Sequence, residues 1–100
     1  LEKYPSLLNN QTFDIYGTGP LHNHFERRLH SNSNIGKKVV LHGFSDKLDD
    51  ILYKYDCLLH LCPTEPFGMV YLEAISAGLV IICPNRGSMI IEDNKTGILF

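Results

Sequence analysis

Short apolar runs alternate along the chain with segments in which apolar residues recur every three or four positions. Most of the runs contain β-branched or aromatic residues, and turn-forming residues bound them, which favours strands. The runs are Phe13–Tyr16, Val39–Gly43, Cys57–Leu61, Val80–Cys83 and one that begins at Ile98. The third run is apolar almost throughout, which is typical of a strand covered on both faces.

Helical spacing fills most of the gaps between these runs. A first helix is predicted over residues 21–29, and a second over residues 48–55 with Ser45 or Asp46 as its cap. Residues 31–36 are predicted to form a polar loop. Alternation of strands and helices requires parallel strands joined by right-handed crossovers, so we predict an α/β fold with a doubly wound parallel sheet.

Composition narrows the class of protein. The chain has 100 residues, 44% of them apolar, which suits one domain at most and is short for a complete enzyme. A net charge of −2 offers no basic stripe, so nucleic acid is a poor candidate partner. The sequence has no signal segment and no apolar run near eighteen residues, so we expect this chain to be neither exported nor membrane-spanning, and cytoplasmic.

The cysteines and histidines argue against a metal site. Cys57, Cys62 and Cys83 are odd in number and lack close pairing, so we expect reduced, mostly buried thiols in a reducing compartment. The five histidines have no metal-ligand spacing. His42 and His60 fall within predicted strands, where a hydrogen-bonded structural imidazole is the ordinary outcome. We therefore predict no metal and no cofactor.

A glycine turn, Gly17-Thr18-Gly19, follows the first predicted strand. A dinucleotide fingerprint would require a third glycine at position 22, where this chain has His22, and Pro20 intervenes. The turn is more simply a strand-to-helix connection that lines a ligand crevice.

The strongest candidate site is the loop and helix from Pro63 to Gly78. Glu65 precedes Pro66, which keeps it extended and above the strand ends. A helix that begins near Phe67 or Gly68 would turn unpaired backbone N–H groups toward an anion such as a diphosphate.

Glu73 lies one to two turns into that helix, within reach of ligand hydroxyls. Two carboxylates around an anion site suit a ligand with phosphates in its middle and hydroxyls at both ends, as in a nucleotide sugar. The residues alone leave another interpretation open, in which Glu65 is solvated and Glu73 pairs with a helix neighbour.

The run from Glu65 to Ala74, followed by Ala77-Gly78, resembles the signature of the retaining glycosyltransferases of family 4, the glycosyl transferases group 1. Its mark is two glutamates separated by seven residues, here Glu65 and Glu73. Further blocks that resemble the second domain of this family, in order, are Ile15–Pro20, Val40–Phe44, Tyr55–Leu58 and Asp93–Gly97. The resemblance implies one Rossmann-like half of a two-domain GT-B enzyme, the half that binds the sugar donor.

The resemblance also implies roles for single residues. Glu65 would meet hydroxyls of the transferred sugar and is the candidate catalytic residue. The backbone of Phe67, Gly68 and Met69 would line the sugar and diphosphate, and the Val70 N–H group would reach a phosphate.

The remaining implied contacts surround the nucleoside. Glu73 would hold the ribose hydroxyls, and the loop of Gly43, Phe44 and Ser45 would border the base. Gly17 lies in the glycine turn that would face the cleft.

The chain departs from the family in two respects. Where relatives commonly carry a Gly-Gly pair, it has Gly87-Ser88 after Asn85-Arg86. The Arg and Lys that neutralise the donor diphosphate would lie upstream of Leu1, and Arg86 does not occupy their place. We therefore expect residues 1–100 to be a partial nucleotide-sugar-binding domain, without the acceptor domain and inactive alone.

The implied function is retaining transfer of a hexosyl-type sugar from a UDP-, GDP- or ADP-sugar to a glycan or lipid-linked acceptor, as in polysaccharide biosynthesis. Peripheral association with the inner face of a membrane, through the missing domain, stays open. Two alternatives remain: a nucleotide-sugar epimerase of the GT-B fold, and a non-catalytic nucleotide-binding module.

Overall fold

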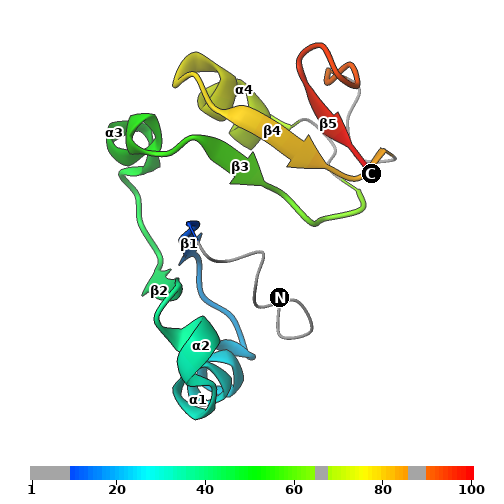
Figure 1. Ribbon diagram of the computed structural model, residues 1–100. Helices are drawn as coiled ribbons and strands as arrows, with labels where there is room; N and C mark the ends of the chain where they lie inside the picture. The colour runs from blue at the N-terminus through cyan, green and yellow to red at the C-terminus, as the bar shows by residue number, and fades with distance from the viewer. Residues whose placement is uncertain (1–9, 65–67, 86–89) are drawn as a thin grey trace. The chain divides into compact units, whose positions relative to one another are not determined.

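The computed structural model describes residues 10–64, 68–85 and 90–100, and these form a mixed α/β structure (Figure 1). The chain divides into two compact units, Leu1–Asp46 and Lys47–Phe100. Each unit contains its own parallel sheet and its own apolar core. No helix among the described residues is long and apolar enough to cross a membrane.

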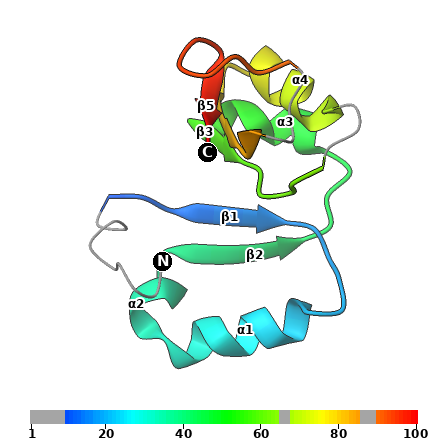
Figure 2. The same ribbon diagram turned by 90° about the vertical axis from the view of Figure 1, so that its right-hand side faces the viewer.

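The first unit pairs two strands and places two helices against them. Its elements are β1 (Phe13–Tyr16), α1 (His22–Ser31), α2 (Ser33–Gly36) and β2 (Val39–Gly43). β1 and β2 run parallel and side by side, and both helices lie on the same side of the pair (Figure 2). The small core consists of buried Ile35 and Val39, against which Phe13 and Leu29 pack.

The second unit is a three-stranded parallel sheet with its longest helix on one face. Its elements are α3 (Leu48–Ile51), the 3₁₀ helix η2 (Leu52–Lys54), β3 (Cys57–Leu59), α4 (Met69–Ser76), β4 (Val80–Cys83) and β5 (Gly97–Leu99). β4 lies between β3 and β5. In-register pairs such as Leu58 with Ile81, and Cys83 with Leu99, bring apolar side chains to the face that α4 covers.

The core of this second unit forms where α4 meets the sheet. Tyr71 and Ala74 contribute from the helix, and Ile81 and Cys83 from β4; all four are fully buried. Tyr71 and Ala74 are three residues apart on the helix, and Ile81 and Cys83 are two apart on the strand, so each pair lies on one face of its element. Burial of these two faces against each other fixes which side of α4 is turned toward β4.

The predicted strands are confirmed in place and in parallel direction, with two boundaries and one burial prediction wrong. β3 ends at Leu59 rather than Leu61, and β5 begins at Gly97 rather than Ile98. Cys57 and Leu59 are exposed, so β3 is not covered on both faces within its unit. The reason is that α4 and η2 both pack against the face that carries Leu58.

Two helix predictions also need correction. The predicted polar loop 31–36 contains the short helix α2, because the Asn32 carbonyl accepts from the N–H groups of Ile35 and Gly36 while Ile35 packs into the core. The predicted helix over residues 48–55 is α3 followed by η2, and its N-cap is Lys47 rather than Ser45 or Asp46.

The end of α4 is a glycine cap. Gly78 has φ of 83°, and its N–H group donates to the Ile75 carbonyl at 2.9 Å. The Leu79 N–H group donates to the Ala74 carbonyl, also at 2.9 Å. This pair of bonds is a Schellman motif, which closes the helix and turns the chain directly toward β4.

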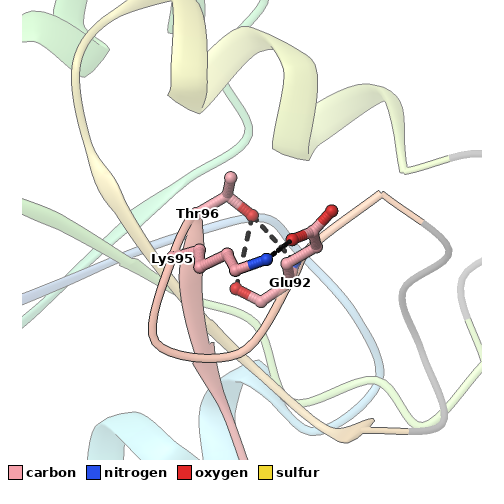
Figure 3. Close-up of polar contacts among 3 residues, drawn as sticks. All are labelled: Glu92, Lys95 and Thr96. Carbon is pink, nitrogen blue, oxygen red and sulfur yellow. Dashed lines mark hydrogen bonds and ion pairs between the residues drawn. The ribbon is translucent and has the colours of Figure 1, made fainter.

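A compact turn leads into β5 (Figure 3). The Thr96 hydroxyl oxygen accepts from the Glu92 N–H group at 2.8 Å, and Lys95 Nζ donates to Glu92 Oε2 at 2.8 Å. Asp93 Oδ1 accepts from the Leu99 N–H group at 2.9 Å. Asn94 takes a left-handed conformation at φ of 57°, which asparagine tolerates better than most residues.

Candidate functional site

The first turn of α4 is fixed by an unusual glycine. Gly68 is the N-cap and has a left-handed backbone at φ of 63° and ψ of 35°. A Cβ atom there would lie 2.6 Å from Cδ2 of Tyr71, so the ring packs directly on the glycine. Only glycine satisfies both the backbone conformation and the contact.

The start of α4 presents backbone donors that the helix itself cannot use. The Gly68 carbonyl accepts from the N–H groups of Tyr71 at 2.9 Å and Leu72 at 3.2 Å. The N–H groups of Met69 and Val70 come earlier in the helix and have no acceptor within it. The first turn carries no acidic residue, so the positive end of the helix dipole is not offset there. This turn has the local chemistry of an anion site.

Glu73 lies on the same helix, in the second turn, and is half-buried. It lines a hollow of about 500 Å³ together with Asp49, Tyr53, Leu72, Ser76 and Ala77. Among the described residues, no hydrogen bond or ion pair joins the Glu73 carboxylate to a protein group. Within that part of the chain, the alternative in which Glu73 pairs with a helix neighbour is not observed.

In the first unit, the structure brings two predicted site segments together. The Gly17 N–H group donates to the Gly43 carbonyl at 2.6 Å, which joins the ends of β1 and β2. Both glycines have positive φ, 127° and 75°. Phe44, the next residue, is 77% exposed. Gly17 also lines a hollow of about 350 Å³ at the glycine turn.

Two predicted site residues, Glu65 and Phe67, lie outside the part of the chain that the structure describes, and their roles stay predictions. Arg86, Gly87 and Ser88, where the chain departs from the family, also lie outside it. The described site residues fall into two groups, with Gly17 and Phe44 in the first unit and Gly68, Met69, Val70 and Glu73 in the second.

His42 and His60 are both hydrogen-bonded structural imidazoles, as predicted. His42 Nε2 lies 2.5 Å from Asp14 Oδ1, and the Tyr16 ring stacks on the imidazole at a centroid distance of 4.6 Å. His60 Nδ1 lies 3.0 Å from Tyr71 Oη. The sequence indicated neither Asp14 nor Tyr71 as the partner, because these pairings join residues that are distant along the chain.

Over the residues that the structure describes, no three His, Cys, Asp or Glu side chains are grouped in a way that could hold a metal ion. The relevant groups at the start of α4 are backbone N–H donors and the Glu73 carboxylate, which is an acceptor. The N–H groups can donate to phosphate oxygens, and the carboxylate can accept from ligand hydroxyls.

The cysteines are free thiols, but the prediction that most are buried is wrong. Cys83 is buried in β4, whereas Cys57 and Cys62 are exposed. Cys57 is exposed because it lies on the face of β3 opposite α4, and Cys62 follows the strand end. Partial desolvation of the thiol, and then the negative charge of Asp56, raise the pKa of Cys57 above its ordinary value, since both disfavour the thiolate.

Replacing Asp56 by Asn is expected to increase the rate at which Cys57 reacts with iodoacetamide at pH 8, by about two- to threefold. The thiolate is the reactive form, and removal of the neighbouring negative charge lowers the thiol pKa toward its ordinary value. Mass spectrometry of the labelled Cys57 peptide would measure the rate, with Asp50→Asn as the control. An unchanged Cys57 rate in Asp56→Asn would contradict the electrostatic contribution.

Comparison with known proteins agrees with the resemblance seen in the sequence. The family profile described as "Glycosyl transferases group 1" matches residues 1–100. The chain is 33% identical over 91 residues to the GtfA subunit of a UDP-N-acetylglucosamine–peptide N-acetylglucosaminyltransferase from Streptococcus pneumoniae serotype 4. This alignment covers 88% of the chain and 18% of the relative.

A second relative comes from a eukaryote. The chain is 33% identical over 79 residues to the GPI3 subunit of a phosphatidylinositol N-acetylglucosaminyltransferase from Saccharomyces cerevisiae, which covers 77% of the chain and 17% of the relative. The chain thus spans less than a fifth of the length of both relatives.

Solved structures give the same result for the fold. The pneumococcal O-GlcNAc transferase GtfA in complex with UDP and GlcNAc superposes with a TM-score of 0.83 at 30% identity, over 99% of this chain and 20% of that one. The GtfA/B complex gives 0.82 at 28% identity, with the same coverage. The chain has the Rossmann-like α/β fold of part of a GT-B glycosyltransferase. It belongs to the glycosyl transferases group 1 family.

Proposed function

We propose that the chain is the donor-binding part of a longer retaining glycosyltransferase, and that its donor is UDP-N-acetylglucosamine. Both relatives described above are named as N-acetylglucosaminyltransferases, and the pneumococcal neighbour is described in complex with UDP and GlcNAc. The acceptors in those two names differ, peptide and phosphatidylinositol. A glycan or lipid-linked acceptor is our proposal for this protein, and the acceptor is bound by the part of the protein that this chain lacks.

The observation that carries the proposal is the arrangement on α4. The N–H groups of Met69 and Val70 are unpaired within the helix, and the Glu73 carboxylate follows about one turn later without a protein partner among the described residues. A diphosphate at the helix start and ribose hydroxyls at Glu73 would satisfy both sets of groups. Phe44 and Gly17 of the first unit keep the roles that the resemblance implies for them, at the base and at the cleft.

Catalysis in this proposal is mainly electrostatic and positional. Negative charge develops on the leaving diphosphate, where the amides of α4 and an upstream Arg and Lys would stabilise it without a metal ion. Glu65 would orient the transferred sugar, with Phe67 beside it. Glu65 need not form a covalent intermediate.

The three free cysteines support a cytoplasmic location, since they suit a reducing compartment.

The test is nucleotide binding to the full-length protein by titration calorimetry. We expect binding of UDP and UDP-N-acetylglucosamine in preference to GDP- and ADP-sugars. Glu73→Ala is expected to weaken UDP binding by about 30-fold to several hundredfold, because two charge-assisted hydrogen bonds to ribose are worth about 2 to 4 kcal/mol. An unchanged UDP affinity in this variant would exclude the proposed role of Glu73.

The matched control is Glu92→Ala, which removes an exposed carboxylate of the same unit that pairs with exposed Lys95. It should leave UDP affinity unchanged. Product analysis with the donor and candidate acceptors then separates the alternatives. Transfer of the sugar supports the proposal, an epimerised sugar indicates the GT-B epimerase, and nucleotide binding with no product indicates a non-catalytic module.

A further inference from the structure

Tyr71 is the residue through which the start of α4 is attached to the sheet. It is the third residue of α4, and its side chain is 0% exposed. A buried phenol needs a polar partner, since an unpaired hydroxyl in the core is costly. One such partner is His60, whose Nδ1 lies 3.0 Å from Tyr71 Oη, with the two rings edge to face at 83°.

His60 is itself held by the sheet. It follows β3 directly, and its N–H group donates to the Ile82 carbonyl of β4 at 2.9 Å. The backbone of His60 is therefore held in place by the pairing of β3 with β4, and this fixes the point from which the imidazole reaches the phenol.

The other side of Tyr71 contacts the N-cap. Its ring packs on Gly68, where an added Cβ would lie 2.6 Å from Cδ2, and its N–H group donates to the Gly68 carbonyl at 2.9 Å. Met69 and Val70, whose amides are unpaired in the helix, are the two residues between Gly68 and Tyr71. A shift of the Tyr71 side chain would therefore change the direction of these two N–H groups.

We propose that the His60–Tyr71 pair is a positioning device that aims the first-turn amides of α4 at the donor diphosphate. This inference rests on the proposed function. It assigns positioning roles to His60 and Tyr71, neither of which is one of the two signature glutamates and neither of which is assigned a contact with the ligand. Small displacements of positioned groups have large effects, since a misplacement near 1 Å can cost up to about a hundredfold.

The test compares UDP with uridine in the full-length protein, because only UDP carries the diphosphate. Tyr71→Phe retains the ring on Gly68 and removes the hydroxyl, and His60→Leu removes the other partner. For each variant we expect UDP affinity to fall about tenfold. Uridine affinity, measured by NMR titration, should stay within about twofold.

Three further variants make the result specific. His60→Asn can place an amide atom near the position of Nδ1, so UDP affinity should return to within about threefold of the wild type. The double variant His60→Leu with Tyr71→Phe should lose no more than either single one, because both remove the same bond. Tyr55→Phe, which deletes a hydroxyl from a half-buried residue packed on the same core, should leave both affinities unchanged.

The outcomes separate this inference from the proposed function. If the wild type binds UDP and Glu73→Ala weakens both UDP and uridine, the donor site stands. In that case, equal losses of UDP and uridine in Tyr71→Phe, or no loss of either, would overturn the positioning role. If Tyr71→Phe fails to fold, the comparison of His60→Leu with His60→Asn decides in the same way.

Discussion

In the full-length protein, Glu65→Gln is expected to reduce sugar transfer by about a thousandfold while UDP affinity stays within a few-fold of the wild type. In the proposed complex Glu65 meets hydroxyls of the transferred sugar, which UDP lacks. The change removes a charge-assisted hydrogen bond to the transferred sugar, whose charge changes during the reaction. Removing one such stabilising group from an active site lowers turnover by about a hundred- to a thousandfold. Initial rates of transfer and calorimetric titration with UDP would measure the two effects.

The split between turnover and nucleotide binding is what makes this test specific. Glu73→Ala should show a different pattern, in which UDP affinity itself falls, because Glu73 is assigned to the ribose, which UDP contains. Glu92→Gln, the same chemical change at an exposed surface carboxylate, should alter neither quantity. Full turnover in Glu65→Gln, or a loss of UDP affinity as large as the loss of turnover, would contradict the assignment of Glu65 to the sugar.

The largest stability loss is expected for Gly97→Ala. Gly97 is the buried first residue of β5, and an added Cβ would lie 2.7 Å from both the Ile81 backbone oxygen and Cγ2 of Ile91. Neither neighbour can move freely, since Ile81 is fully buried in β4 and Ile91 belongs to the same core. We expect the free energy of unfolding to fall by about 2 to 3 kcal/mol, measured by denaturant titration.

Gly19→Ala is the matched control for this change. A Cβ atom at Gly19 would have no heavy atom within 4 Å, and its φ is not positive, unlike that of Gly17. Its effect should be within about 0.5 kcal/mol. A similar stability for both alanine variants would show that β4 and β5 yield to the added methyl group more readily than their packing indicates.

Local pattern was sufficient to predict most of the fold. The strands β2 and β4 are β-branched runs, and Gly78 marks the end of α4, so these features follow from short-range chemistry. The pattern failed where tertiary packing decides. Residues 31–36 have loop composition, but burial of Ile35 stabilises a helical turn there. Leu59 is apolar in a strand and nevertheless exposed, because its unit covers one face only.

The candidate site was partly predictable for the same reason. The spacing of the glutamates and the glycine at the helix start are visible in sequence, so Gly68, Met69, Val70 and Glu73 could be placed on one helix in advance. The left-handed backbone of Gly68 and the bond between Tyr71 and His60 are not visible there, because they depend on how α4 packs against β3.

The short connection after α4 sets where this part of the fold can change during evolution. Three residues separate Ser76 from Val80: the glycine cap uses them all, and the Val80 N–H group already donates to the Asp56 carbonyl. An insertion or deletion there would break the cap or shift the strand, so its length should be invariant among functional descendants. The connection ahead of the helix is longer, since nine residues separate Leu59 from Met69. New ligand preferences should therefore arise from changes in length and sequence on that side.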